Sequence, residues 1–316
     1  MKKYNDNDFV HKIGNPNLSL TESPSSYKRI WVFDKRDIVL YVFVLLLWVT
    51  FMSLFTDFSG TFCIYWYFIP FGIMGATIAM STPAGGGLVF FPVLIRFGFA
   101  PQEVVAFSLA TETIGMGFGS IRWLIEDFKA FQWKVIISTI PGGWIGLYLG
   151  TMVIPIQSAK IARLIFSLVG LSLCILTLYT HYRRKGFSNT EINVQFPHII
   201  SFFIVGIIGG FITSYIGFGV DLYIFFFIVL LFSFSIHKGT VSSIIIIASN
   251  APLGFFLHAH YLNTIRWEFW QMVIPGVLTG AVIGPKLLRS VGEKRMMYGL
   301  CTLLFLEFVV TVFFRI

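Results

Sequence analysis

The sequence predicts an all-α polytopic membrane protein with two inverted repeats, and three observations lead to this fold class. Hydrophobic residues make up 56% of the 316-residue chain and charged residues only 12%, about half the charged share of soluble domains. Two of the long apolar segments are interrupted by glycine near their middle. The two halves of the chain also match one another at a constant offset of 134 residues.

The chain divides into five parts by composition. Residues 1–36 form a polar segment that we predict to be a cytoplasmic tail, and residues 37–63 hold one extra transmembrane helix and an outer loop. The first repeat covers residues 64–181, a basic cytoplasmic linker covers 182–197, and the second repeat covers 198–316. Each repeat is predicted to consist of a re-entrant hairpin followed by three transmembrane helices.

Apolar runs give the individual helices. Most have about the length of a single crossing, which needs about 20 residues. Runs 62–97 and 197–233 are too long for one crossing and short for two, and they are interrupted at Gly85–Gly87 and at Gly217 and Gly219. We therefore expect a helix–break–helix hairpin in each, with the break buried in protein or lining a cavity. The single-length runs are 38–56, 102–121, 134–154, 160–181, 239–258, 268–285 and 295–314.

The internal match does not depend on common apolar residues alone. Trp133 corresponds to Trp267, and Ile140-Pro141-Gly142 corresponds to Ile274-Pro275-Gly276. The two tryptophans begin equivalent helices and are read as anchors at the membrane surface. A frame of glycines matches as well: Gly72 with Gly206, Gly75 with Gly209, Gly85 with Gly219, Gly146 with Gly280, and Gly150 with Gly284.

Lysine and arginine give the orientation, because these residues gather in cytoplasmic loops. The clusters alternate correctly if each hairpin returns to the side from which it entered, so each repeat crosses the membrane three times and the second repeat is inverted. Arg96 and Arg266 fall on the predicted outer side and oppose this assignment. The clusters comprise Lys28, Arg29, Lys35 and Arg36; Arg122, Lys129 and Lys134; Arg183, Arg184 and Lys185; and Lys286, Arg289, Lys294 and Arg295.

The paired breaks predict an anion site. A helix that starts at a break presents unpaired N–H groups and the positive end of its dipole, and two inverted hairpins bring two such ends together. The candidate donors around the breaks are Gly85, Gly86, Gly87, Leu88, Gly217, Gly219 and Val220. The following helix of each repeat adds Ser108 and Thr111, and Ser242 and Asn250. Hydroxyl groups in membrane helices also bond to their own helix or to a neighbouring one, and that alternative stays open.

Two acidic residues lie in these apolar segments, Asp221 in the second hairpin and Glu112 in the helix after the first. An acid within a membrane segment is costly, which indicates a functional role such as carrying a coupling proton or ion. The alternatives are that Asp221 caps the helix that begins at its break and that Glu112 bonds to a neighbouring helix. A metal site is not predicted, because no third ligand accompanies His258 and His260.

The segment G-G-G-L-V-F-F-P-V-L, followed by F-A-P-Q-E-V-V-A-F-S-L-A-T, resembles the TauE/SafE family of sulfite exporters and related permeases. The second half, G-F-G-V-D followed by H-K-G-T-V-S-S, is similar to a degenerate counterpart, so the resemblance covers about 64–314. It implies transport of small sulfur-containing anions such as sulfite, thiosulfate or sulfonates. The chain departs from the family pattern in its long polar tail and in Asp221, which stands where the first break has Gly87.

Other functional classes fit less well. The net charge of +8 is explained by loop lysines and arginines, so nucleic acid is not an expected partner. Cys63, Cys174 and Cys301 form no Cys-x-x-Cys pair, which argues against a thiol redox motif or a zinc ribbon. The triple glycine lacks the Gly-Lys-Ser/Thr of a phosphate loop. The spacing of Gly219 and Asp221 does not match that of intramembrane aspartyl proteases, and no enzyme or cofactor is predicted.

The sequence therefore predicts a multi-pass permease or exporter of the bacterial inner membrane with a cytoplasmic N-terminus. Its expected partners are the lipid bilayer and a small anion, and the family resemblance implies that this anion contains sulfur. A passive anion channel and a permease for a non-sulfur carboxylate are the alternatives. Proton or sodium coupling, homo-oligomerisation and the direction of transport all stay open at this point.

Overall fold

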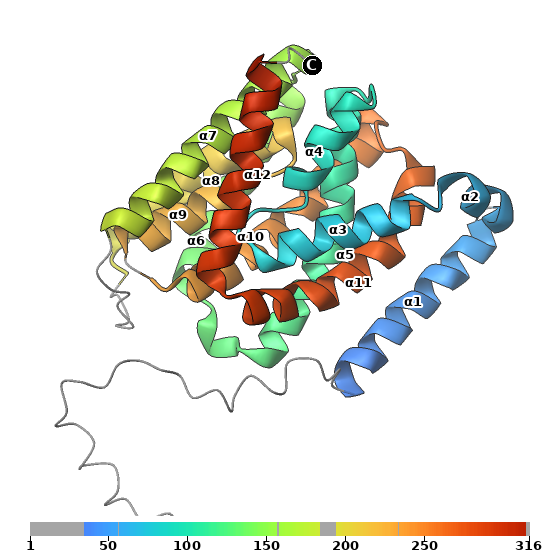
Figure 1. Ribbon diagram of the computed structural model, residues 1–316, viewed down its shortest axis with the longest axis horizontal. Coiled ribbons are helices and arrows are strands. Elements are labelled where there is room, and N and C mark those ends of the chain that lie inside the picture. The colour runs from blue at the N-terminus through green and yellow to red at the C-terminus, as the bar shows by residue number, and fades with distance from the viewer. Residues whose placement is uncertain (1–34, 56, 157, 184–193, 233, 314–316) are drawn as a thin grey trace, which may run out of the picture. The chain divides into compact units, whose positions relative to one another are not determined.

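A computed structural model describes residues 35–55, 58–156, 158–183, 194–232 and 234–313, together with Asp57. All regular structure in these residues is helical (Figure 1). The predicted tail, residues 1–36, lies almost wholly outside the described residues, and so does most of the linker 182–197. The breaks and both repeats lie within them.

The helices follow the predicted apolar runs closely, with two short π-helical turns, η5 and η6, at the ends of α6 and α10. Their bounds are α1 Lys35–Phe55, α2 Phe58–Tyr65, α3 Phe68–Ser81, α4 Gly87–Arg96, α5 Pro101–Glu126, η4 Phe128–Ala130, α6 Trp133–Tyr148, η5 Leu149–Val153, α7 Ala159–Arg183, α8 Phe196–Ile216, α9 Val220–Leu231, α10 Ile236–Phe256, η6 Leu257–Leu262, α11 Trp267–Val291 and α12 Glu293–Phe313.

Six described helices are long and apolar enough to cross a membrane, which makes this a multi-pass membrane protein. They are α5, α6 with η5, α7, α8, α10 with η6, and α11. The helix α8 is on this list by length, although the sequence predicted it as half of a hairpin. In α1 the apolar stretch Tyr41–Ser53 is shorter than a full crossing needs, so the extra transmembrane helix in 37–63 stays a prediction.

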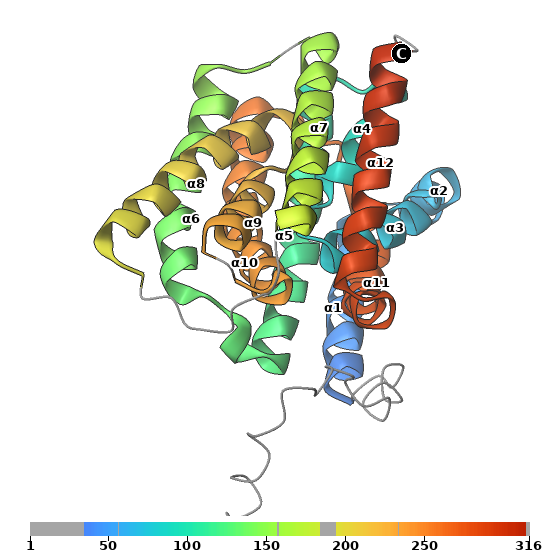
Figure 2. The same cartoon turned by 60° about the vertical axis from the view of Figure 1, so that its left-hand side comes forward.

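Helices from different halves of the chain pack along one another. The helix α3 lies along α11, and α8 lies along α6 (Figures 1 and 2). Glycines allow both approaches: a Cβ on Gly142 would lie 3.1 Å from Ile207 N, and one on Gly276 would lie 3.0 Å from Ile73 N. These two contacts are related by the same 134-residue offset that relates the sequences. Small residues at such positions let membrane helices approach closely.

The equivalent helices of the two halves also meet one another. The helix α5 packs against α10, and α7 packs against α12; Figure 2 shows α7 and α12 side by side. Outside this core, α1 docks on α11, where Tyr41 Oη lies 2.8 Å from Thr279 Oγ1 and Trp48 Nε1 donates to Gln271 O at 2.8 Å.

The outward faces of α7 and α8 are apolar. On each helix the exposed large side chains recur at spacings typical of one helix face, so they lie along one side of the helix. A stripe of this kind is costly in water and favourable in lipid. The exposed residues are Ile161, Leu164, Leu168, Ile175 and Leu178 on α7, and Phe196, Ile199, Ile200, Ile204 and Ile208 on α8.

Two details of the prediction differ from the structure. The outer loop that was expected within residues 37–63 holds the short helix α2, whose first turn is capped by the Asp57 carboxylate accepting from Gly60 N. Arg122, assigned to a cytoplasmic loop, lies within α5 and is buried, with Nη1 donating to Val282 O at 2.7 Å. A guanidinium that bonds a carbonyl on a neighbouring helix is a structural link, so Arg122 is a poor marker of membrane orientation.

Candidate functional site

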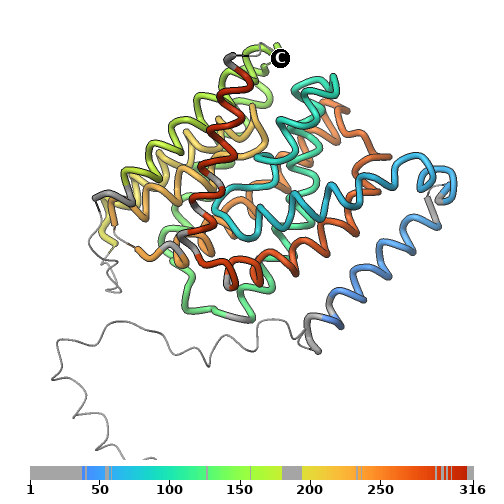
Figure 3. Tube along the Cα trace, viewed as in Figure 1, coloured from blue at the N-terminus to red at the C-terminus, as the bar shows by residue number. Residues whose placement is uncertain are grey.

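The first break separates α3 from α4 and has a local cause. Thr82 is extended, with φ of −131° and ψ of 163°, as expected for a residue before proline. Pro83 cannot supply an N–H to continue the helix. The chain then passes through Ala84 and Gly85, Gly86 caps the next helix, and α4 begins at Gly87. The course of the trace through this break is visible in Figure 3.

The second break separates α8 from α9 and is made by glycine conformations. Gly217 ends α8 in the left-handed region with φ of 80°, and Gly219 has φ of 155°. Residues with a Cβ rarely adopt either backbone conformation. Between them, Phe218 is fully buried. The new helix α9 starts at Val220.

The two breaks lie against one another. A Cβ on Gly87 would lie 2.7 Å from the carbonyl carbon of Gly217, and one on Gly217 would lie 3.7 Å from Gly87 Cα. Residues 81–90 and 213–222 are all buried. The sequence-predicted glycines of the first break and of the second break are therefore brought together in the interior. Only a residue without a side chain fits at Gly87, which explains why the first break has glycine at this position.

Glu112 caps the helix that begins at the first break. Its side chain reaches from the middle of α5, and Oε1 accepts from Gly87 N at 3.1 Å. Glu112 is 2% exposed, and Oε2 has no hydrogen-bond partner among the described residues. A buried carboxylate oxygen without a donor is costly, so this oxygen is available to a proton or to a ligand.

Asp221 caps the helix that begins at the second break. Its Oδ1 accepts from Gly219 N at 2.9 Å, and the residue is 1% exposed. The other oxygen, Oδ2, also lacks a partner within the described chain. Both carboxylates face Gly85: its Cβ position would lie 2.5 Å from Glu112 Oε1 and 3.0 Å from Asp221 Oδ2. The two acids therefore belong to one cluster.

Ser108 and Thr111 also lie in this cluster. The Ser108 hydroxyl is within hydrogen-bond reach of Gly217 O at 3.2 Å and of Glu112 Oε1 at 3.4 Å, and it can donate to one of them at a time. Thr111 lines a small cavity beside the first break, and its Oγ1 is buried without a partner in the described residues. The cavity is lined by Ala76, Ala79, Met80, Gly86, Phe90, Thr111, Glu112, Gly115, Met116 and Val277.

Several of the N–H groups that the sequence predicted as free donors have partners within the chain. Leu88 N donates to Gly85 O at 3.2 Å, and Val220 N donates to Thr213 Oγ1 at 2.9 Å. Together with the two carboxylate caps, these bonds occupy donors at the start of each helix. Thr213 was not predicted as a site residue. A threonine in the last turn before a glycine break would have been the signal.

Ser242 and Asn250, both on α10, have other partners. The Ser242 hydroxyl accepts from Gln132 N at 3.1 Å, in the turn before α6. Asn250 Nδ2 donates to Ile246 O at 2.7 Å within its own helix. Its Oδ1 faces Gly143 of α6 and is buried without a partner in the part of the chain that the structure describes. The structure gives neither residue a hydrogen bond to the breaks.

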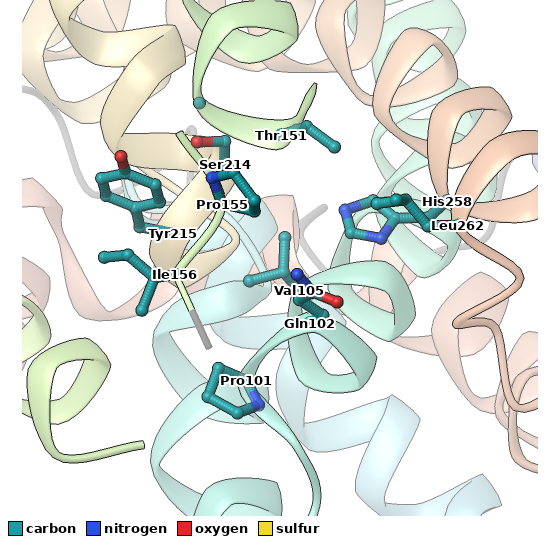
Figure 4. Close-up of a pocket in the computed structure, with 11 residues that line it drawn as sticks. Pro101, Gln102, Val105, Thr151, Pro155, Ile156, Ser214, Tyr215, His258 and Leu262 are labelled. Carbon is teal, nitrogen blue, oxygen red and sulfur yellow. The ribbon is translucent and has the colours of Figure 1, made fainter. Parts of the chain in front are cut away.

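A second pocket lies between the start of α5, η5, the end of α8 and η6 (Figure 4). Ser214 and Tyr215 place it close to the second break. His258 is 1% exposed; its Nδ1 lies 2.8 Å from Thr264 Oγ1, while Nε2 has no partner among the described residues. The lining residues are Pro101, Gln102, Val105, Gly150, Thr151, Pro155, Ile156, Ser214, Tyr215, His258 and Leu262.

Metal ligation finds no support in the described residues, which contain no group of three or more His, Cys, Asp or Glu placed to hold an ion. The family model described as sulfite exporter TauE/SafE matches residues 68–310. Searches of curated proteins and of solved structures gave no match. The matched range contains both breaks, both carboxylates and nearly all of the two predicted repeats. The chain belongs to the sulfite exporter TauE/SafE family, a family of membrane transporters.

Proposed function

We propose that the chain is a secondary transporter of small oxyanions, sulfur-containing ones above all, and that it binds them where the two helix breaks meet. One observation carries the proposal: Gly87 and Gly217, which belong to breaks in different halves of the chain, are in contact in the buried interior. Each break starts a helix, so two positive helix ends converge on one place. Family membership supports the substrate class.

We further propose that the two halves are inverted repeats. The exchanged packing of α3 on α11 and of α8 on α6 supports this arrangement, because each half places the first helix of its hairpin on the other half. The helix α8 ends at Gly217, buried against Gly87, which favours a re-entrant hairpin over a full crossing. Each repeat then holds a hairpin and three transmembrane helices.

The residues around the breaks have distinct roles in this proposal. The anion accepts hydrogen bonds from N–H groups near Gly85–Leu88 and near Gly217–Val220, and from the hydroxyls of Ser108 and Thr111. Ser242 and Asn250 lie on α10, which packs along α5, and contribute to the path rather than to the centre of the site. Glu112 and Asp221 are the groups that couple transport to a proton or a sodium ion.

The positions of two cavities support the proposal of alternating access. One lies beside the first break and the other beside the second, near the turn at Pro155. Movement of one repeat against the other would open each cavity to one side of the membrane in turn. The proposed location is a bacterial inner membrane, with the N-terminus in the cytoplasm on the basis of the lysine and arginine clusters.

The proposal is tested with purified protein in two steps. A thermal-shift screen against sulfite, sulfate, thiosulfate, sulfonates and carboxylates identifies the anion, and counterflow in liposomes then measures its exchange. Gly86→Val should abolish both, because a Cβ at Gly86 already lies 2.8 Å from Phe90 Cε2 and 3.5 Å from Glu112 Oε1. Gly117→Val is the matched control, since no atom lies within 4 Å of its Cβ position. Unchanged exchange in Gly86→Val rules out the site, and flux without counterflow indicates a channel.

A further inference from the structure

We propose that Glu112 and Asp221 compete with the transported anion for the helix N–H groups, so that each anion binds together with protons that neutralise these carboxylates. This inference rests on the proposed function and specifies how the same site is regulated. It arises from the observation that the N–H groups of Gly87 and Gly219, where the anion would bind, are already held by carboxylate oxygens of the chain at 3.1 and 2.9 Å.

A carboxylate is a chemical stand-in for a small oxyanion. It presents negatively charged oxygens to the same donors, and a charged acceptor is held more strongly than a neutral one. An incoming anion must therefore displace Glu112 from Gly87 N and Asp221 from Gly219 N. Displaced as charged groups, the carboxylates would remain beside the anion in a buried site, and this is strongly unfavourable.

Protonation removes this conflict. The partnerless oxygens, Glu112 Oε2 and Asp221 Oδ2, are the positions where protons from the aqueous phase would bind. A neutral carboxylic acid releases the backbone N–H more readily and can itself donate a hydrogen bond to the anion. When the anion leaves, each acid returns its proton to water, and its carboxylate takes up the cap again. The proton and the anion therefore travel in the same direction.

Among the described residues, no cation acts on the two carboxylates in a way that would substitute for a proton. Asp221 of α9 is the charged group that acts on Glu112. The buried cations Arg122 and Lys286 lie four and five residues before the ends of α5 and α11, and Arg122 Nη1 donates to Val282 O. Among the groups on the other helices packed against α5, Tyr215 of α8 donates to Ile154 O, Arg96 of α4 pairs with Glu307, and His237 of α10 pairs with Asp127.

Ser108 fits the same exchange. Its single hydroxyl hydrogen can be donated to Glu112 Oε1 or to Gly217 O. When Glu112 is displaced, this hydrogen becomes available to the anion that takes its place. The hydroxyl thus serves whichever acceptor occupies the first break, without a change in the backbone.

The test measures anion affinity against pH with thiosulfate, whose charge is constant between about pH 5.5 and about pH 7.5. Affinity of the wild type should rise up to about tenfold per unit decrease in pH for each proton taken up. Glu112→Gln is neutral at every pH, so it should bind thiosulfate with a weakened pH dependence. In liposomes it should weaken accumulation driven by a pH gradient more than it weakens counterflow exchange.

Glu103→Gln is the matched control, because it is the same substitution near the outer end of the same helix, where Glu103 pairs with Arg266. It should behave as the wild type. Asp221→Asn provides a second variant if Glu112→Gln does not fold. Wild-type affinity that is independent of pH overturns the inference, as does a pH-driven accumulation that survives in both acid variants. A wild type that binds none of the anions contradicts the proposed function itself, so the two failures are distinguishable.

Discussion

Gly87 lies against Gly217, with 2.7 Å between the position of a Gly87 Cβ and the carbonyl carbon of Gly217. The two residues belong to different halves of the chain and to different helix breaks. Their contact makes a single place out of two interruptions that look unrelated in the sequence. It also explains why the acid Asp221 of the second break has glycine as its counterpart in the first, since a side chain at Gly87 would meet backbone.

Gly87→Ala tests this contact. The added methyl group must push the two breaks apart, and overpacking of this kind costs about 1–3 kcal/mol. We expect a lower melting temperature and loss of anion binding. Gly117→Ala, whose Cβ position has no neighbour within 4 Å, should leave both unchanged. Equal behaviour of the two variants would show that the breaks do not touch.

The repeat relationship predicts a matched pair of defects. Gly142 and Gly276 are equivalent by the 134-residue offset, and each allows a close approach to the first helix of the opposite hairpin. Gly142→Ala and Gly276→Ala should therefore lower the melting temperature by similar amounts, while Gly299→Ala, which has open space at its Cβ position, should not. A large defect in only one of the pair would contradict the equivalence of the two halves.

Thr213 is predicted to stabilise the second break. Its hydroxyl accepts from Val220 N at 2.9 Å and donates to Gly209 O at 2.9 Å. Thr213→Val keeps the shape and leaves a buried N–H without a partner, at a cost of about 1–3 kcal/mol. Thr213→Ser should restore most of the stability, as measured by thermal unfolding in detergent. If valine and serine are equally tolerated, the hydroxyl has no such role.

The membrane orientation can be tested with single cysteines. In a Cys63→Ser background, Lys129→Cys should react with an impermeant maleimide only from the cytoplasmic side, and Ser158→Cys only from the outer side. Both positions are exposed and lie at opposite ends of α6 with η5. Tyr261→Cys, two residues before the position equivalent to Lys129, should react from the outer side if the repeats are inverted. If the cysteines at positions 129 and 261 are both labelled from the same side of the membrane, the repeats are parallel and not inverted.

The sequence predicted the helices well because apolar length and glycine interruptions are local signals. The break at Pro83–Gly86 and the one at Gly217–Gly219 fall within the segments where they were expected. The contacts made by the carboxylates could not be predicted. Glu112 is 25 residues from the N–H that it caps, and nothing in its local sequence identifies that partner. Asp221 capping its own helix was one of the two open alternatives, and the geometry shows that cap while its proton role stays a proposal.

Other misses have physical reasons too. Arg122 was assigned to a loop because a charged residue is unfavourable in an apolar helix. The sequence does not show that Val282 O, on another helix, accepts a hydrogen bond from its guanidinium. The short helix α2 was missed because its cap, Asp57, and its serine and glycine residues have the composition of a loop. The roles of Ser242 and Asn250 toward the anion stay a prediction; the partners that the structure shows for them are Gln132 N and Ile246 O.

The most direct test of the central claim is a structure with bound selenite, an analogue of sulfite whose selenium is located by anomalous scattering. We predict one strong selenium peak between the N–H groups of Gly87 and Gly219, with the Glu112 carboxylate withdrawn from Gly87. A selenium peak confined to the pocket beside His258, or a Glu112 cap that remains in place with the anion bound elsewhere, would contradict the account.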